Sequence, residues 1–312
     1  MKSGDGYRGK ITCVGDMIEP IRGMPDNFIY RGQTNVEWEI LPSLLRNKVS
    51  DLWVIFECLL VYYLATHKDE MPYVTTYDPF DLMITLQHFG IPTRMLDVTT
   101  DPYTALFFAC DGLNNEAESK DGSLYLINKT AFANESLNST KTFFQERGTE
   151  ELYTRLRFTD IKLVTPLAKN PRLRSQHGQM LFFPFATPQN HFSKYVTLKD
   201  YSDLWKKEYE CREGSSDNVC VYIYKKVDRL YKQDILQELD EEYGINQESI
   251  YCTRTEKIKH AEMYYKNLFQ IAMCKAEKIM FKMQSAILAK RHHLDPAKVL
   301  MEAISQILKG HL

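Results

Sequence analysis

One stretch of the sequence, residues 82–111, constrains the fold more than any other. Its first part predicts a helix that Gly90 ends in a left-handed conformation, and Pro92 then holds the preceding residue extended. The apolar run 105–110 predicts a return to a buried element. A polar turn held by core on both sides indicates a positioned site, or else a hydrogen-bonded network that only fixes the fold. The polar residues between these two anchors are Gln87, His88, Thr93, Arg94, Asp97, Thr99, Thr100 and Asp101.

A second polar segment follows a short β-prone run at residues 28–30, where Arg31, Gly32 and Gln33 come directly after the run. A guanidinium group is a rigid fork of donors that suits an anion, and glycine lets a ligand approach the backbone. We therefore expect an anion-binding site here. The alternative is a buried Arg31 paired with an internal carboxylate such as that of Asp97.

A third polar segment precedes the strand that we predict at residues 179–183. Arg172, Arg174, Gln176 and His177 gather immediately before this strand. Polar groups thus cluster next to predicted buried elements in three distant parts of the chain.

The predicted elements favour the α+β class, with a mixed or antiparallel sheet core flanked by helices. We predict strands at 28–30, 123–127, 161–164, 179–183 and 219–224, the last being the best candidate for a central strand because it is β-branched and aromatic. We predict helices at 51–67, 80–89 and 231–243, with Gly244 as the stop of the last one.

The C-terminal part of the sequence differs in kind. Residues 255–290 contain no Gly or Pro and carry an apolar stripe at helical spacing, and Asp295 with Pro296 then predicts the start of a last helix. We expect a C-terminal helical hairpin, with domains at 1–254 and 255–312. Its stripe either packs on the main domain, which is the default expectation, or makes a self-association or protein-partner contact.

The composition limits the binding partners and the cellular compartment that we expect. The net charge of −2 gives no global electrostatic reason for nucleic-acid binding, although a local basic patch would allow it. The seven cysteines form no CxxC pair, and the N-terminal residues lack a signal-peptide pattern. We expect a cytoplasmic protein with no membrane partner. We also expect no metal site, because His292 and His293 are adjacent rather than at ligand spacing.

Four blocks, in the order and spacing of a known family, resemble the FRG domain, which is named for an aromatic-Arg-Gly motif. The blocks are YRGQ at 30–33, LPSLLR at 41–46, QHFGIPTRMLD at 87–97 and ALFFA at 105–109. SQHG at 175–178 and the helix before Tyr-Gly-Ile at 243–245 resemble later blocks, so the resemblance covers about residues 11–251. Val98 stands where the family commonly has tryptophan, and His177 where it often has glutamine. The resemblance implies a bacterial or phage-borne protein in a defence or toxin-like setting.

The layout of the polar segments is also similar to that of ADP-ribosyltransferases, which use NAD. This analogy implies a polar pocket for a nucleotide-like ligand, in which Arg31, Asp97 and Gln176 are catalytic. Asp97 would stabilise the positive charge of an oxocarbenium-like centre, with Glu57 as the reserve carboxylate, although no late glutamate stands at the expected place. The ligand-binding residues would be Gln33, Gln87, His88, Thr93, Arg94 and His177.

Two further functions remain open at this point. One is a non-catalytic module that binds a nucleotide, a modified base or a protein through Arg31 and Arg94. The other is a nuclease with His88 and His177 as an acid–base pair. The sequence carries no GxxxxGK[ST], and its GxGxxG at residues 4–9 follows no predicted strand, so neither an ATPase nor a Rossmann-type domain is indicated.

Overall fold

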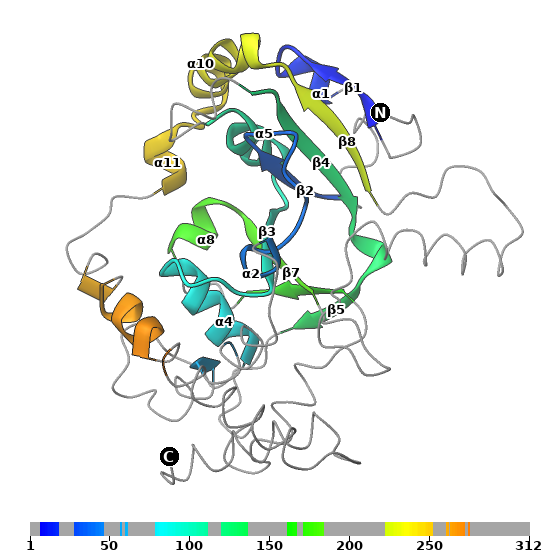
Figure 1. Ribbon diagram of the computed structural model, residues 1–312. Helices are drawn as coiled ribbons and strands as arrows, with labels where there is room; N and C mark the ends of the chain where they lie inside the picture. The colour runs from blue at the N-terminus through cyan, green and yellow to red at the C-terminus, as the bar shows by residue number, and fades with distance from the viewer. Residues whose placement is uncertain are drawn as a thin grey trace, which may run out of the picture.

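A mixed sheet organises the protein in the computed structural model, which describes residues 7–18, 28–46, 57, 60–61, 79–111, 120–136, 161–166, 171–183, 222–251, 260–261, 263–271 and 274 (Figure 1). Within these residues the sheet has eight strands in the order β1-β8-β4-β2-β3-β7-β6-β5. The outermost pairs, β1 with β8 and β5 with β6, are parallel, and the other five pairs are antiparallel. The α+β class is therefore confirmed.

The strands and helices have the following bounds. The strands are β1 (Tyr7–Ile11), β2 (Phe28–Gln33), β3 (Met95–Thr99), β4 (Gly122–Asn128), β5 (Ala133–Ser136), β6 (Lys162–Thr165), β7 (Gly178–Phe182) and β8 (Tyr222–Val227). The helices are α1 (Gly15–Ile18), α2 (Ser43–Arg46), α4 (Pro79–His88), α5 (Pro102–Cys110), α8 (Pro171–Ser175), α10 (Lys232–Tyr243) and α11 (Gln247–Tyr251), with 3-10 turns η4 (Lys129–Ala131) and η5 (Arg229–Tyr231).

Each face of the sheet has its own hydrophobic core, because side chains alternate along a strand. On β4, Leu124 and Leu126 belong to the core that includes α5 and α10. Tyr125 and Ile127 belong to the opposite core, together with Leu96, Val98 and Leu181 of β3 and β7.

Helix α5 lies directly against the backbone of β2 and β4 at two glycines. A Cβ atom on Gly32 would lie 1.9 Å from the carbonyl oxygen of Ala105, and one on Gly122 would lie 2.3 Å from that of Ala109. We expected Gly32 to admit a ligand to the backbone, but the structure places a helix there instead. This close packing fixes the position of α5 and of the residues at its C-terminal end.

Most predicted elements that fall on described residues are confirmed, and two need correction; the predicted helix 51–67 lies outside them except for residues 57, 60 and 61. The predicted strand 219–224 is β8, which lies three residues further along and next to the edge strand β1 rather than at the centre. The stretch interpreted as a polar turn contains β3, an interior strand of the sheet. Gly90 and Gly244 have the expected positive φ angles of 81° and 65°.

The described part of the C-terminal segment packs on the main domain. Residues 263–271 are helical, and Ala261, Tyr265 and Leu268 of the predicted stripe are buried. The predicted helix after Asp295, and with it the hairpin, lies outside the described residues. None of the helices in the described ranges has the length and apolar character needed to cross a membrane.

Candidate functional site

A cavity of about 310 Å³ opens where β2 and β3 diverge. Strand β2 pairs with β4 over its full length, from Phe28 to Gln33, but its register with β3 is limited to Tyr30 opposite Thr99. Continued antiparallel pairing would set Arg31 opposite Val98. The strands separate instead, so residues 31–33 have a strand neighbour on one side only and border the cavity on the other.

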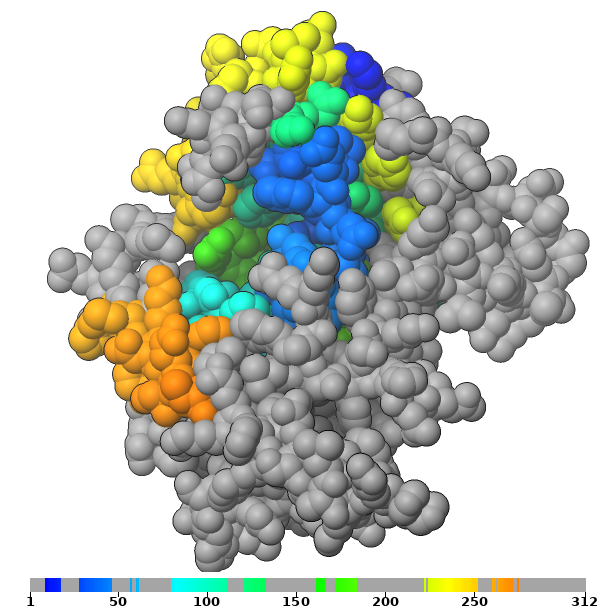
Figure 2. Space-filling model, in the orientation of Figure 1, coloured from blue at the N-terminus to red at the C-terminus, as the bar shows by residue number. Residues whose placement is uncertain are grey.

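Segments far apart in the sequence line this cavity. Segment 28–46 lies beside α4 and α8 on the face shown in Figure 2. The lining residues are Tyr30, Arg31, Gly32, Gln33, Thr34, Trp38, Arg46, Ile84, Gln87, His88, Asp97, Val98, Thr99, Phe108, Asp111, Arg172, Leu173, Gln176, Gly178, Gln179 and Met180.

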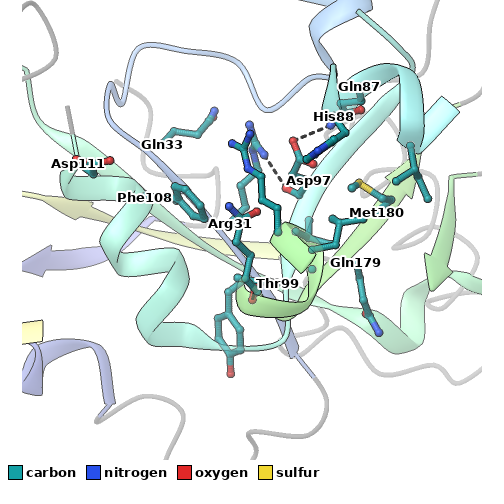
Figure 3. Close-up of a pocket in the computed structure, with 18 of the residues that line it drawn as sticks. Arg31, Gln33, Gln87, His88, Asp97, Thr99, Phe108, Asp111, Gln179 and Met180 are labelled. Carbon is teal, nitrogen blue, oxygen red and sulfur yellow. Dashed lines mark hydrogen bonds between the residues drawn. The ribbon is translucent and has the colours of Figure 1, made fainter. Parts of the chain in front are cut away.

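The guanidinium group of Arg31 bridges the gap between the diverging strands. Its Nη1 donates a hydrogen bond of 2.6 Å to the backbone carbonyl of Asp97 (Figure 3). Its Nε is buried and has no hydrogen-bond acceptor among the described residues. Burial lowers the pKa of Arg31 to about 10. The nearby Asp97 carboxylate acts to raise this pKa, and the positive charge of Arg46 acts to lower it further. Arg31 is therefore a charged group with donor capacity left over.

A directional chain of hydrogen bonds holds the Asp97 carboxylate at the cavity. The backbone N–H of Met95 donates to Thr93 Oγ1 at 3.2 Å, so the Thr93 hydroxyl proton is directed to Gln87 Oε1 at 2.7 Å. This sets the Gln87 amide so that its Nε2 donates to Asp97 Oδ2 at 2.7 Å (Figure 3). Asp97 is exposed in a strand whose other residues are buried. The carboxylate therefore faces the cavity as a hydrogen-bond acceptor.

Arg46 supplies a second cation to the same cavity. Its Nε donates to the Leu41 carbonyl at 3.0 Å, which leaves the two terminal nitrogens of the fork for other acceptors. Burial lowers the pKa of Arg46, and the Asp97 carboxylate opposes this shift. Among the described residues, two guanidinium groups and one carboxylate thus leave one net positive charge at this end of the cavity.

The opposite wall carries an aromatic ring and hydrogen-bond acceptors. Phe108 and Asp111 come from the C-terminal end of α5, and Gln33 from the end of β2. Asp111 Oδ2 accepts from the Tyr251 hydroxyl at 2.5 Å and Oδ1 from Gln247 Nε2 at 3.1 Å. Burial, followed by the bond to Asp111, raises the pKa of Tyr251. Helix α11 thus fixes Asp111 against the cavity.

The structure brings six of the nine predicted site residues onto the cavity. Arg31, Asp97 and Gln176, which we interpreted as catalytic, line it together with Gln33, Gln87 and His88. The side-chain nitrogen of Gln176 donates to the Ile250 carbonyl at 3.2 Å, and its backbone carbonyl accepts from Thr99 Oγ1 at 2.7 Å. Its turn is therefore anchored to both β3 and α11.

Three predicted ligand-binding residues do not line the cavity. Thr93 is buried behind Gln87. Arg94 is buried with Glu57, whose carboxylate accepts from the Arg94 backbone N–H at 2.8 Å and from its Nε at 2.6 Å. His177 is exposed and has a φ of 47°, at the end of the turn that follows α8.

These positions correct two of our expectations. The arginine in a buried ion pair is Arg94 rather than Arg31, and its partner is Glu57 rather than Asp97. Since both Glu57 oxygens accept from Arg94, the reserve carboxylate does not serve the cavity.

Sequence reasoning missed Arg46, Phe108, Asp111 and Arg172 as lining residues. The first three had a signal, because Arg46 ends the LPSLLR block and the other two lie at the end of the apolar run after the central block. Arg172 belonged to the third polar cluster. Among the described residues, no group of three or more His, Cys, Asp or Glu side chains is arranged to hold a metal ion.

Residues 26–118 match the family model of the FRG domain. The match spans β2, α2, α4, β3 and α5, and with them Arg31, Arg46 and both carboxylates of the cavity, whereas Arg172 lies outside it. The chain therefore carries an FRG domain. Strands β6, β7 and β8 lie outside the matched residues but belong to the same sheet. No curated protein and no solved structure matches the chain.

Proposed function

We propose that the cavity binds a nucleotide-like ligand and that NAD is its substrate in a glycosidic-bond cleavage of the ADP-ribosyl type. One observation carries the proposal: Arg31, Asp97 and Gln176, from three distant segments, line one cavity. A cation for a phosphate and a carboxylate for a developing positive charge are the groups that such a reaction needs.

Each residue has a distinct part in this reaction. Arg31 and Arg46 hold the phosphate of the substrate through their remaining guanidinium donors. Asp97 stabilises the positive charge that develops at the anomeric carbon as the C1′–N bond breaks and its electron pair leaves with nicotinamide. Gln176 orients the water or acceptor that attacks this carbon. With water, NAD yields nicotinamide, ADP-ribose and a proton.

The size and polarity of the cavity fit part of this substrate. A volume of about 310 Å³ is at the lower end of the range for small-molecule sites, roughly 300–1,000 Å³. One half of the dinucleotide would be enclosed, and the other half would extend out of the opening. Consumption of NAD would arrest a cell, which agrees with the defence or toxin-like setting that the family implies.

The second candidate is a binding module that breaks no bond, for a nucleotide or for a protein. Two observations favour it. The Gln176 side-chain nitrogen already donates a hydrogen bond to the Ile250 carbonyl, and no glutamate is present among the described lining residues. The nuclease alternative has less support, because His177 does not share the cavity with His88.

Nicotinamide release tests the proposal. We would incubate the purified full chain with NAD, with and without a cell extract as a source of acceptors, and quantify nicotinamide by chromatography. We expect release by the wild-type protein, and a loss of at least about a hundredfold in Asp97→Asn and Arg31→Gln, the scale of one electrostatic group at a transition state. Asp234→Asn on α10 and Arg229→Gln on η5 are matched surface controls and should retain full activity.

Absence of release under both conditions would exclude cleavage. The binding module would then be tested by thermal shift with NAD and by recovery of the intact ligand.

A further inference from the structure

We infer that the cavity holds a single nucleoside phosphate unit, with its phosphate between Arg31 and Arg46 and an N–H-bearing ring against Gln33, Phe108 and Asp111. This inference rests on the proposed function, since it names the part of the ligand that the same cavity encloses.

The first observation is the pair of cations at one end of the cavity. Arg31 and Arg46 repel each other, and among the described residues the Asp97 carboxylate is the acidic group that offsets the charge of both. Each guanidinium uses one nitrogen on a backbone carbonyl, so both keep donors for a further acceptor. A phosphate placed between them would replace repulsion with charge-assisted hydrogen bonds.

The second observation is the polarity of the other wall. The Oε1 atom of Gln33 is buried and accepts no hydrogen bond from the described residues. Both Asp111 oxygens already accept one bond each, but a carboxylate has about four acceptor positions in all. Acceptors in a partly buried wall favour a ligand that brings N–H groups, such as an exocyclic amino group or a carboxamide.

The third observation is that the two sets of groups lie on different sides of Arg31. Figure 3 shows Gln33, Phe108 and Asp111 on one side, and Asp97, Gln87 and His88 on the other. A ring packed on Phe108 would therefore lie beside the cation pair, as a base and a 5′-phosphate lie at the two ends of one mononucleotide.

Calorimetric titration of the full chain with matched ligands tests the inference. The ligands are the two halves of NAD, AMP and nicotinamide mononucleotide, with their nucleosides adenosine and nicotinamide riboside, and ribose 5-phosphate. We expect at least one mononucleotide to bind about 10- to 100-fold more tightly than its nucleoside, the range for charged hydrogen bonds.

Substitutions at Arg46 and at Phe108 test the two ends of the site separately. Arg46→Gln should remove the preference for the mononucleotide and leave the affinity for the nucleoside unchanged. Arg46→Lys, which keeps the charge but not the fork, guards against loss of the fold and should give an intermediate preference. Phe108→Ala should weaken the mononucleotide about tenfold and leave ribose 5-phosphate unchanged.

Equal affinity of nucleoside and mononucleotide in both pairs, or a preference that persists in Arg46→Gln, would overturn the inference. Nicotinamide release without a phosphate-dependent preference would leave the proposed cleavage intact and exclude this mode of binding. A phosphate-dependent preference without nicotinamide release would support the inference and exclude the cleavage.

Discussion

Phe89 and Tyr265 stack face to face, with ring centroids 4.4 Å apart and planes inclined by 8°. Phe89 directly follows α4, the helix that carries Gln87 and His88 to the cavity. Tyr265 belongs to the helical residues 263–271. The C-terminal segment thus contacts the residue next to the candidate site.

This stacking predicts a role for the C-terminal segment in stability. Tyr265→Ala should lower the free energy of unfolding by about 3–5 kcal/mol, because it removes a fully buried ring and leaves a cavity. Denaturant unfolding measures the change. Met263→Ala, on the exposed side of the same helix, should change it by less than about 0.5 kcal/mol. Equal effects of the two substitutions would show that the stack does not anchor this segment.

The glycine of the aromatic-Arg-Gly motif predicts a steric effect. Gly32→Ala would force a methyl group into the backbone of α5, so we expect a loss of more than about 3 kcal/mol or a failure to fold. Gly15→Ala is the control, since its Cβ would meet only Cys13 Sγ at 3.6 Å, and it should change stability by no more than about 1 kcal/mol. Circular dichroism melts of the two variants compare them directly. A folded Gly32→Ala protein of normal stability would mean that α5 does not pack as described.

The buried ion pair predicts that loss of a core carboxylate costs much more folding stability than loss of a surface carboxylate. Glu57→Gln removes the buried carboxylate charge that accepts from the Arg94 backbone N–H and Nε, and it should cost about 3–5 kcal/mol of folding stability. Glu37→Gln breaks the exposed pair with Lys120 and should cost less than about 1 kcal/mol. Urea titrations of both variants measure the difference. If Glu57→Gln instead altered ligand affinity at unchanged stability, the assignment of Arg94 to the core would be wrong.

The hydrogen-bond chain behind Asp97 predicts that Thr93 positions the site without touching the ligand. Thr93→Val keeps the shape but removes the hydroxyl, so the Gln87 amide loses the bond that sets its orientation toward Asp97. We expect a tenfold or greater loss in nicotinamide release, or in mononucleotide affinity, at a stability cost of about 1–3 kcal/mol.

Thr93→Ser should restore that loss because it returns the hydroxyl. Thr130→Val, an exposed threonine on η4, is the matched control and should leave both readouts unchanged. A valine variant with normal affinity and normal release would show that Gln87 is held without Thr93.

Local signals in the sequence were sufficient to predict many of the helices and strands. Gly90 and Gly244 adopt the left-handed conformations expected of helix stops, and the alternation of Leu124 and Leu126 identified β4. Strand β3 escaped detection because its five residues include Asp97, whose exposure toward the cavity breaks the pattern of a buried strand. Neither strand propensity nor hydrophobic periodicity can identify a polar residue whose side chain faces a cavity inside the molecule.

The candidate site was harder to predict, because partner choice is not local. Arg31 and Arg94 have similar sequence surroundings, each next to a predicted buried element. Only the three-dimensional structure shows that Arg94 is the buried arginine, because it forms an ion pair with Glu57, 37 positions earlier in the sequence. Arg46 was overlooked for the related reason that its distance from Asp97 depends on packing between separate segments.

The single residue pair that joins β2 to β3 divides the sheet into two half-shells of four strands, β1-β8-β4-β2 and β3-β7-β6-β5. Along this seam the Arg31 guanidinium spans from one half-shell to the backbone of the other. A rotation of the half-shells about the Tyr30–Thr99 pair would change the distance from Arg31 to Asp97, and it would also disturb the hydrophobic core that β2 and β4 share with β3 and β7. Spectroscopic labels on the two half-shells would show whether this shared core keeps the distance fixed in solution.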